Sequence, residues 1–186
     1  MSVAVPSITA AAATESTTTT SQVVQSNDLA KSYADFVFTG IGVQDAQGQF
    51  KSFEKTGNPT VVQGKDIKGN VALLTGSSAF KTPVSESQYK DLQDGLSMEA
   101  FFKYDPNAST NGEHDIFSNQ QGGGIGLGVD SGKLTFFAHV DGSYRQPNVP
   151  LKTGKWIHAV GVIDKKAKAV KLYVNGQLVD SKPITA

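Results

Sequence analysis

Several features that mark common functional classes are missing from this sequence. Its 186 residues include no cysteine, which excludes disulfide bonds, thiolate metal ligands and a cysteine nucleophile. Lys plus Arg and Asp plus Glu both number 17, so no excess of basic charge attracts a phosphate backbone. No apolar run reaches the roughly 20 residues that cross a bilayer. We therefore expect no nucleic-acid partner and no membrane insertion.

Familiar catalytic motifs are absent as well. No Gly-x-Ser-x-Gly, His-Glu-x-x-His or Gly-x-x-x-x-Gly-Lys motif occurs. The glycine run Gly122–Gly128 is not followed by a helix pattern, so we interpret it as a closely packed strand and not as a phosphate loop. Glu99 is isolated, and Glu113 and Asp115 lie in a turn-rich stretch. Because neither arrangement makes a convincing acid–base pair, we expect no enzymatic activity in this chain.

The first 27 residues are rich in Ser, Thr and Ala. Ala10–Ala13 resembles the end of a secretory signal and Thr14–Ser21 resembles an exported tether, although a basic start and a continuous apolar core are missing. Such tracts bury too little apolar surface to fold. We predict a disordered segment over residues 1–27, which is either a signal remnant with its tether or a tolerated cytosolic tail. The first alternative places the protein outside the cell or at its surface.

From residue 28 onward, the pattern predicts one β-rich domain over residues 28–186. This length can bury a single core, and its short apolar runs are separated by Gly, Asn, Asp and Pro at the spacing of an all-β protein. Residues 85–94 offer one short helix, since Ser85 and Gln88 have the spacing of a capping box and Gly95 follows as a stop signal.

Alternation within the predicted strands indicates which side chains face the core. In residues 134–140, every second residue is apolar, which predicts a core face and leaves Phe137 and His139 on the other side. Residues 157–163 are apolar at nearly every position, as in a central strand covered on both faces. Asn175–Gly176 is the pattern of a two-residue hairpin turn.

Five segments resemble, in this order, the laminin-G-like domains of the concanavalin A-like lectin and glucanase superfamily, in particular bacterial LamG-like jelly-roll modules. The most specific of them reads KLYVNGQLV and ends the series; the five segments cover residues 70–80, 96–103, 124–136, 153–160 and 171–179. Phe101 stands where the family pattern has Trp. The resemblance implies an all-β fold, an antiparallel β-sandwich or jelly roll of the concanavalin A-like type.

The resemblance stops before the family pattern does. Such domains continue past the last hairpin into two further strands, and neither pattern is visible after Ser181. The resemblance therefore implies that the sandwich lacks its last strands in this chain, or receives them from elsewhere. An unpaired strand edge exposes hydrogen-bonding groups and apolar surface, so we expect association through that edge.

The resemblance also implies a calcium ion, because many laminin-G-like domains bind one through the hard oxygen ligands of their loops. The candidates here are Asp105, Asn107, Asn111 and Asp115. The alternative is that these residues only make turns. The histidines are too dispersed for a zinc site, and we expect His158, which follows Trp156 on a buried strand, to pack in the core.

Carbohydrate binding needs an aromatic ring to stack on a sugar face and polar groups to reach its hydroxyls. One hairpin and the loop after it supply such a set: Phe137, His139, Tyr144, Arg145, Gln146 and Asn148. The alternative is ordinary cross-strand aromatic packing.

Two classes of function follow from these observations. The first is a non-catalytic module that binds carbohydrate or a cell-surface protein. LamG-like modules often decorate larger secreted bacterial hydrolases such as phosphoesterases and glycosidases, so the resemblance implies a parent of that kind. The second is a structural or adhesion spacer without a small ligand. Selective glycan binding separates the two.

Overall fold

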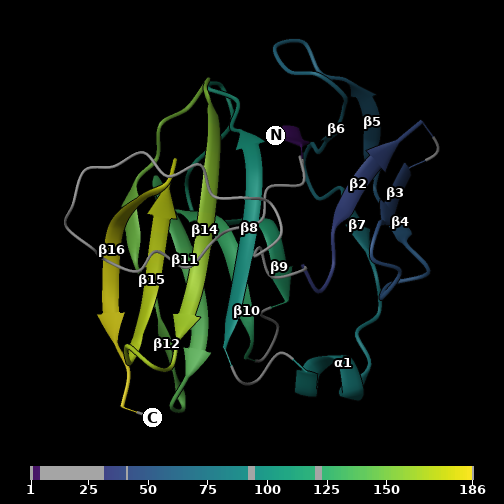
Figure 1. The fold of residues 1–186 in the computed structure, drawn as a ribbon. Helices are drawn as coiled ribbons and strands as arrows, with labels where there is room; N and C mark the ends of the chain where they lie inside the picture. The colour runs from purple at the N-terminus through teal and green to yellow at the C-terminus, as the bar shows by residue number, and fades with distance from the viewer. Residues whose placement is uncertain (1, 5–31, 41, 92–94, 120–122, 186) are drawn as a thin grey trace, which may run out of the picture.

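The computed structural model describes residues 2–4, 32–40, 42–91, 95–119 and 123–185, which form strands β1 to β16 and a short helix, α1 (Figure 1). No helix among these residues has the length and apolar character to cross a membrane. The strands pair antiparallel in all twelve pairings. The expected all-β antiparallel fold is confirmed.

The larger sheet has seven strands. At its centre, β8 (Leu96–Lys103) pairs along its whole length with β14 (Trp156–Asp164), from Leu96 opposite Ile163 to Lys103 opposite Trp156. In spatial order the sheet consists of β16 (Gln177–Pro183), β15 (Ala169–Val174), β14 (Trp156–Asp164), β8 (Leu96–Lys103), β1 (Ser2–Ala4), β6 (Asn70–Leu73) and β5 (Thr60–Gln63).

The smaller sheet lies face to face with β8, β14 and β15 and completes the sandwich (Figure 1). In spatial order it consists of β12 (Ser143–Arg145), β11 (Lys133–Val140), β10 (Ile125–Asp130) and β9 (Glu113–Asn119). Strand β12 pairs with residues 138–140 of β11, and β13 (Asn148–Pro150) pairs with residues 133–135.

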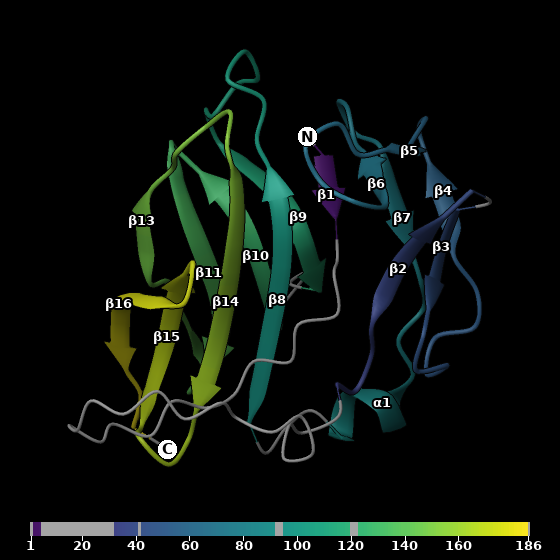
Figure 2. The ribbon, with the colours of Figure 1, turned by 45° about the horizontal axis from the view of Figure 1, so that its top comes forward.

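Shorter elements lie beside the sandwich, next to β8 and β9 (Figure 2). They are the pair β2 (Phe36–Thr39) and β3 (Gly42–Asp45), the pair β4 (Glu54–Thr56) and β7 (Ala79–Lys81), and helix α1 (Glu86–Asp91). The predicted capping box is present: the Ser85 backbone N–H donates to Gln88 Oε1 at 2.8 Å, and the Gln88 N–H donates to Ser85 Oγ at 3.3 Å.

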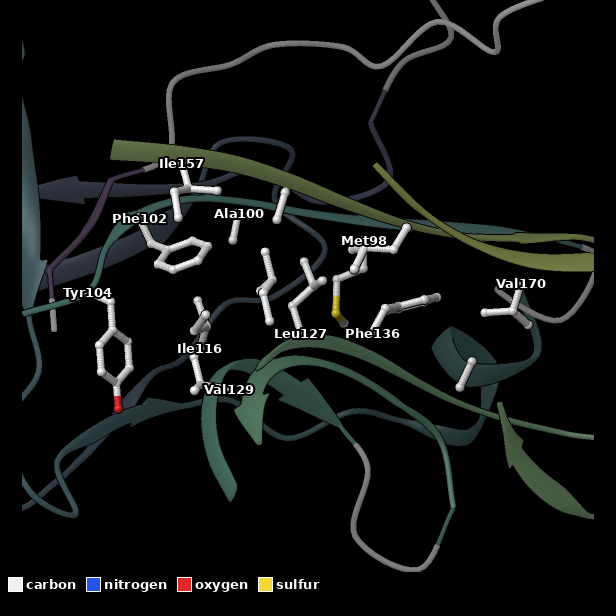
Figure 3. Close-up of a cluster of buried hydrophobic side chains, with 14 of the residues drawn as sticks. Met98, Ala100, Phe102, Tyr104, Ile116, Leu127, Val129, Phe136, Ile157 and Val170 are labelled. Atoms are coloured by element: carbon white, nitrogen blue, oxygen red, sulfur yellow. The ribbon is translucent and has the colours of Figure 1, made fainter. Parts of the chain in front are cut away.

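The core lies between the two sheets (Figure 3). Phe102 of the larger sheet and Leu127 and Phe136 of the smaller sheet are fully buried there. The core face predicted for residues 134–140 is confirmed, because Leu134, Phe136 and Ala138 are buried in this core and Val140 packs against it. A Cβ atom at Gly161 would overlap the Phe136 ring, so the glycine allows the sheets to approach.

Hairpin turns fix the registers of the sandwich strands. Asn175 and Gly176 have φ values of 51° and 81°, as a type I′ turn requires, and they join β15 to β16 as predicted. Asp141 and Gly142, at 54° and 71°, reverse the chain from β11 into β12 in the same way.

Residues 2–4, at the start of the predicted N-terminal segment, form β1 between β8 and β6. Residues 1 and 5–31 lie outside the described part of the chain, so the boundary at residue 28 stays a prediction. Strand β1 pairs with residues 101–103 of β8. Among the described residues, no strand pairs with Leu96–Ala100 on that side, and association through a strand edge stays a prediction.

Candidate functional site

An open hollow lies at one edge of the sandwich, where β12 of the smaller sheet meets the end of β16 of the larger sheet. Its volume is about 540 Å³. We call it the β12/β16 hollow. The residues that line it are Tyr144, Arg145, Gln146, Lys182, Pro183, Ile184 and Thr185.

The turn at Asp141–Gly142 sets the aromatic side of the hollow. It pairs His139 with Tyr144, and the two rings meet edge to face at a centroid distance of 5.0 Å. Tyr144 is 38% exposed, and His139 is exposed as well. An aromatic surface is therefore presented to solvent at this edge.

Arg145 follows Tyr144 on β12 and so leaves the strand on the opposite face. Its Nε donates to the backbone oxygen of Pro183 at 3.1 Å, and its Nη1 donates to Ser143 Oγ. The first bond joins the smaller sheet to the larger one. Tyr144 and Arg145 both line the hollow, so the hollow reaches residues from both faces of β12.

Two further polar contacts cross between the sheets at this edge. The backbone N–H of Asn148 donates to Asp180 Oδ2 at 2.9 Å. Thr185 donates to Asp141 Oδ2 from its backbone nitrogen at 2.7 Å and from its Oγ1 at 2.9 Å. These bonds hold the walls of the hollow in place, because each one ties a segment of one sheet to a segment of the other.

The charge of the hollow depends on which of its cations are paired. Burial disfavours the ionised form of Asp180, but the backbone N–H groups of Asn148 and Ser181 and the Lys182 ammonium outweigh it and hold the pKa of Asp180 below its usual value. Lys182 Nζ lies 2.9 Å from Asp180 Oδ2. Among the described residues, no carboxylate forms an ion pair with Arg145.

Three of the six predicted ligand-binding residues line the hollow: Tyr144, Arg145 and Gln146. His139 lies beside it against Tyr144. Asn148 supports the loop, since its Nδ2 donates to the Gln146 backbone oxygen at 2.9 Å.

The expectation that Phe137 offers an exposed ring is wrong. Phe137 is 2% exposed, and its ring lies close to Gly128 of the neighbouring strand β10. Since Gly128 has no side chain, the Phe137 ring settles against the backbone there instead of projecting into solvent.

Residues 182–185 also line the hollow, and the sequence did not identify them as binding residues. The hairpin at Asn175–Gly176 predicts that a strand follows, but nothing in the local pattern says that its end approaches β12 of the other sheet. Ile184 gives one signal in retrospect: it is 5% exposed, and an isolated apolar residue after a polar strand indicates that the chain turns toward the core.

The four predicted calcium ligands lie on two successive elements of the chain, a loop and the strand after it. Asp105, Asn107 and Asn111 follow β8 in one loop, where Asp105 Oδ1 accepts the Asn107 N–H at 2.8 Å, the bond expected of a turn-forming Asp. Asp115 lies on β9 instead, and desolvation raises the pKa of its carboxyl. The described residues contain no group of three or more His, Cys, Asp and Glu able to hold a metal, and calcium binding stays a prediction.

His158 lies on the outer face of the larger sheet, and the expectation that it packs in the core is wrong. His158 is not in the core: its Nε2 lies 3.0 Å from Glu99 Oε2, and the two side chains are 23% and 29% exposed. Phe101 and Trp156 stack beside them at 5.0 Å. Glu99, which is isolated in the sequence, thus has a cross-strand partner.

Several solved structures share this fold. The receptor-binding domain of the botulinum neurotoxin C/D mosaic serotype superposes with a TM-score of 0.66 at 19% identity, over 79% of this chain and 38% of that one. Botulinum neurotoxin type C, whose cell entry depends on interaction with two ganglioside molecules, superposes with a TM-score of 0.61 at 17% identity, over 80% of this chain and 38% of that one. For the binding domain of Paraclostridial Mosquitocidal Protein 1, the TM-score is 0.62 at 19% identity, over 80% of this chain and 39% of that one.

The chain thus spans less than two fifths of each of these structures, and at such identities the likeness shows the fold alone. No curated protein matches the sequence. Residues 74–186 match the sequence profile of a laminin G family described as the concanavalin A-like lectin/glucanases superfamily. The matched residues contain every strand of the smaller sheet and the strands β8, β14, β15 and β16. Since this match covers more than half of its length, the chain belongs to the laminin-G-like family of the concanavalin A-like lectin/glucanases superfamily.

Proposed function

We propose that this chain is a non-catalytic carbohydrate-binding module whose ligand occupies the β12/β16 hollow. The observation that carries the proposal is the meeting of an exposed aromatic ring, Tyr144, with Arg145 and Gln146 in one hollow. A sugar ring has an apolar face that stacks on an aromatic ring and hydroxyls that bond to amide and guanidinium groups.

The hollow is held in shape before any ligand arrives. Arg145 is bonded to Pro183, Asn148 to Asp180, and Thr185 to Asp141. Side chains that are already ordered lose less conformational entropy on binding. An open hollow of this kind suits a weakly held sugar better than a buried cofactor.

The comparisons support carbohydrate as the class of ligand. Cell entry of botulinum neurotoxin type C depends on gangliosides, and the binding domain of botulinum neurotoxin DC forms a complex with SialylT, with a TM-score of 0.62 over 82% of this chain. The family to which this chain belongs also carries lectins in its description.

Finer features of the function belong to the same proposal. The module is carried by a larger secreted bacterial hydrolase, such as a phosphoesterase or glycosidase, and directs it to glycans or surface proteins. Calcium, held by the loop that contains Asp105, Asn107 and Asn111, orders that loop. The spacer or adhesion role is the alternative that the following experiment tests.

A glycan array with the purified protein, run in Ca²⁺ and again in EDTA, tests the proposal. Binding of selected glycans by the wild type and its loss in Tyr144→Ala support it. Leu178→Ala is the matched control, because Leu178 is 52% exposed and lies on β16 outside the hollow. If no glycan binds in either buffer, the spacer role replaces the proposal, and binding that persists in Tyr144→Ala places the sugar elsewhere.

A further inference from the structure

We infer that the ligand of the β12/β16 hollow is an acidic oligosaccharide that presents a carboxylate to Arg145. This inference rests on the proposed carbohydrate-binding function and names the class of sugar. It comes from the charges and the unused hydrogen-bond donors of the hollow.

The lining of the hollow carries two cations and no acidic side chain. Lys182 is paired with Asp180 at 2.9 Å, and Asp180 is held in its ionised form by its own hydrogen bonds. The Arg145 guanidinium has no carboxylate partner among the described residues. Arg145 is therefore the cation of the lining that has no carboxylate bonded to it among the described residues, since the nearby Asp141 carboxylate is bonded to Thr185 instead.

Arg145 keeps donors for such an anion. A guanidinium has five N–H donors, and Arg145 uses one from Nε for Pro183 and one from Nη1 for Ser143. One N–H on Nη1 and two on Nη2 remain. Two parallel bonds from these terminal nitrogens match the two oxygens of a carboxylate, and the bonds to Pro183 and Ser143 fix the guanidinium plane beforehand.

The arrangement on β12 sets the size of the ligand. Tyr144 and Arg145 are consecutive residues of one strand and leave it on opposite faces. A ligand of two or more rings can contact both faces of the strand, with a neutral ring on the aromatic surface of Tyr144 and His139 and an acidic ring at Arg145.

Isothermal titration with three probes tests the inference: sialyllactose, 3′-sulfolactose and lactose. The wild type is expected to bind sialyllactose roughly tenfold more tightly than lactose, the effect of a hydrogen-bonded charge. Arg145→Gln removes this preference. Lys152→Gln is the matched control, because it removes one positive charge from an exposed loop outside the hollow and leaves the preference intact.

A second variant keeps the test independent of folding. Arg145→Lys retains the charge but lacks the two-pronged donor geometry, and it is expected to show an intermediate preference. Equal affinity for sialyllactose and lactose overturns the inference while the proposed function stands. Equal affinity for sialyllactose and 3′-sulfolactose overturns the carboxylate assignment. If the wild type binds none of these probes and no glycan on an array, the proposed function itself fails.

Discussion

The sandwich and the shorter elements beside it are stabilised in different ways. In the sandwich, β8 has eight residues and β14 nine, long enough for four or more side chains of each strand to enter one core. The paired strands beside it, β2, β3, β4 and β7, have three or four residues each. None of the hydrophobic side chains in these four described strands is fully buried.

The shorter region relies on aromatic contacts and local hydrogen bonds. Phe36 meets Phe50, Phe53 and Phe117 at centroid distances of 5.5, 5.6 and 5.4 Å, and Phe117 belongs to β9 of the sandwich. The carboxylate of Asp45 accepts four backbone N–H groups, from Asp35, Gln47, Gln49 and Phe50. This region contacts the sandwich at a few separate points: the Phe36 ring meets Phe117, Phe38 packs against the core, and Asn70 Nδ2 of β6 donates to the Phe38 backbone oxygen. The sandwich, in contrast, is closed by a continuous core.

The largest expected effect breaks the sandwich itself. In Gly161→Ala, the new methyl group overlaps the fully buried Phe136 ring, so the ring or the backbone has to shift. Overpacking of this kind costs about 3 kcal/mol of unfolding free energy. Urea unfolding followed by the fluorescence of Trp156, the one tryptophan of the chain, measures the loss.

Gly40→Ala is the control for this substitution, because no atom lies within 4 Å of the point that a Cβ atom at Gly40 would occupy. We expect its unfolding free energy to stay within roughly 0.5 kcal/mol of the wild type. A Gly161→Ala protein as stable as Gly40→Ala would show that the two sheets separate easily, contrary to a close-packed core.

A smaller effect is expected where the shorter region meets the sandwich. Phe36→Ala removes the ring that bridges Phe50 and Phe53 to Phe117. Since Phe36 is half-buried, we expect the free energy for local unfolding of the shorter region to fall by about 2 kcal/mol, which is less than the cost of truncating a fully buried Phe. Limited proteolysis is expected to cut within residues 32–91 sooner, while the Trp156 unfolding transition changes little.

Val84→Ala is the matched control, because Val84 is 40% exposed and makes none of these ring contacts. The alternative result is also informative. If Phe36→Ala shifts the Trp156 transition as much as it accelerates proteolysis, the shorter region and the sandwich unfold as one cooperative unit.

The sequence predicted the parts of the fold that depend on neighbours in the chain. Alternation in residues 134–140 identifies the core face, and Asn175–Gly176 identifies a hairpin, because strand period and turn geometry are local. The position of His158 could not be read in this way. Its strand is apolar on both faces, so the pattern does not say which face is the core.

Only one side of the hollow, residues 144–146, was predicted from the sequence, because the other side also depends on how the sheets pack. Tyr144, Arg145 and Gln146 form a local set that sequence reasoning identifies, but residues 182–185 reach them from the other sheet. That approach depends on how the two sheets stack, which no short pattern encodes. Phe137 shows the same limit, since its burial depends on Gly128 in the neighbouring strand.

The smallest effect concerns the polar edge of the sandwich and its dependence on pH. Asp180→Asn removes the charge that faces Lys182 and weakens the bond from Asn148, with an expected loss of about 1 kcal/mol at pH 7. Because the folded pKa of Asp180 lies below its unfolded value, its contribution is complete above the unfolded pKa of about 3.9. The contribution is lost as the pH falls through the folded pKa.

Wild type and Asp180→Asn should therefore differ in stability at pH 7 and converge as the pH falls below about 4. Thermal unfolding at a series of pH values measures this convergence. Glu54→Gln, on the exposed strand β4, serves as the control in the shorter region, where no contact between the two sheets is at stake. A stability difference between wild type and Asp180→Asn that is the same at every pH would mean that the side chain acts through packing. In that case, the core beneath the edge of the sandwich stabilises it, and the charge on Asp180 does not.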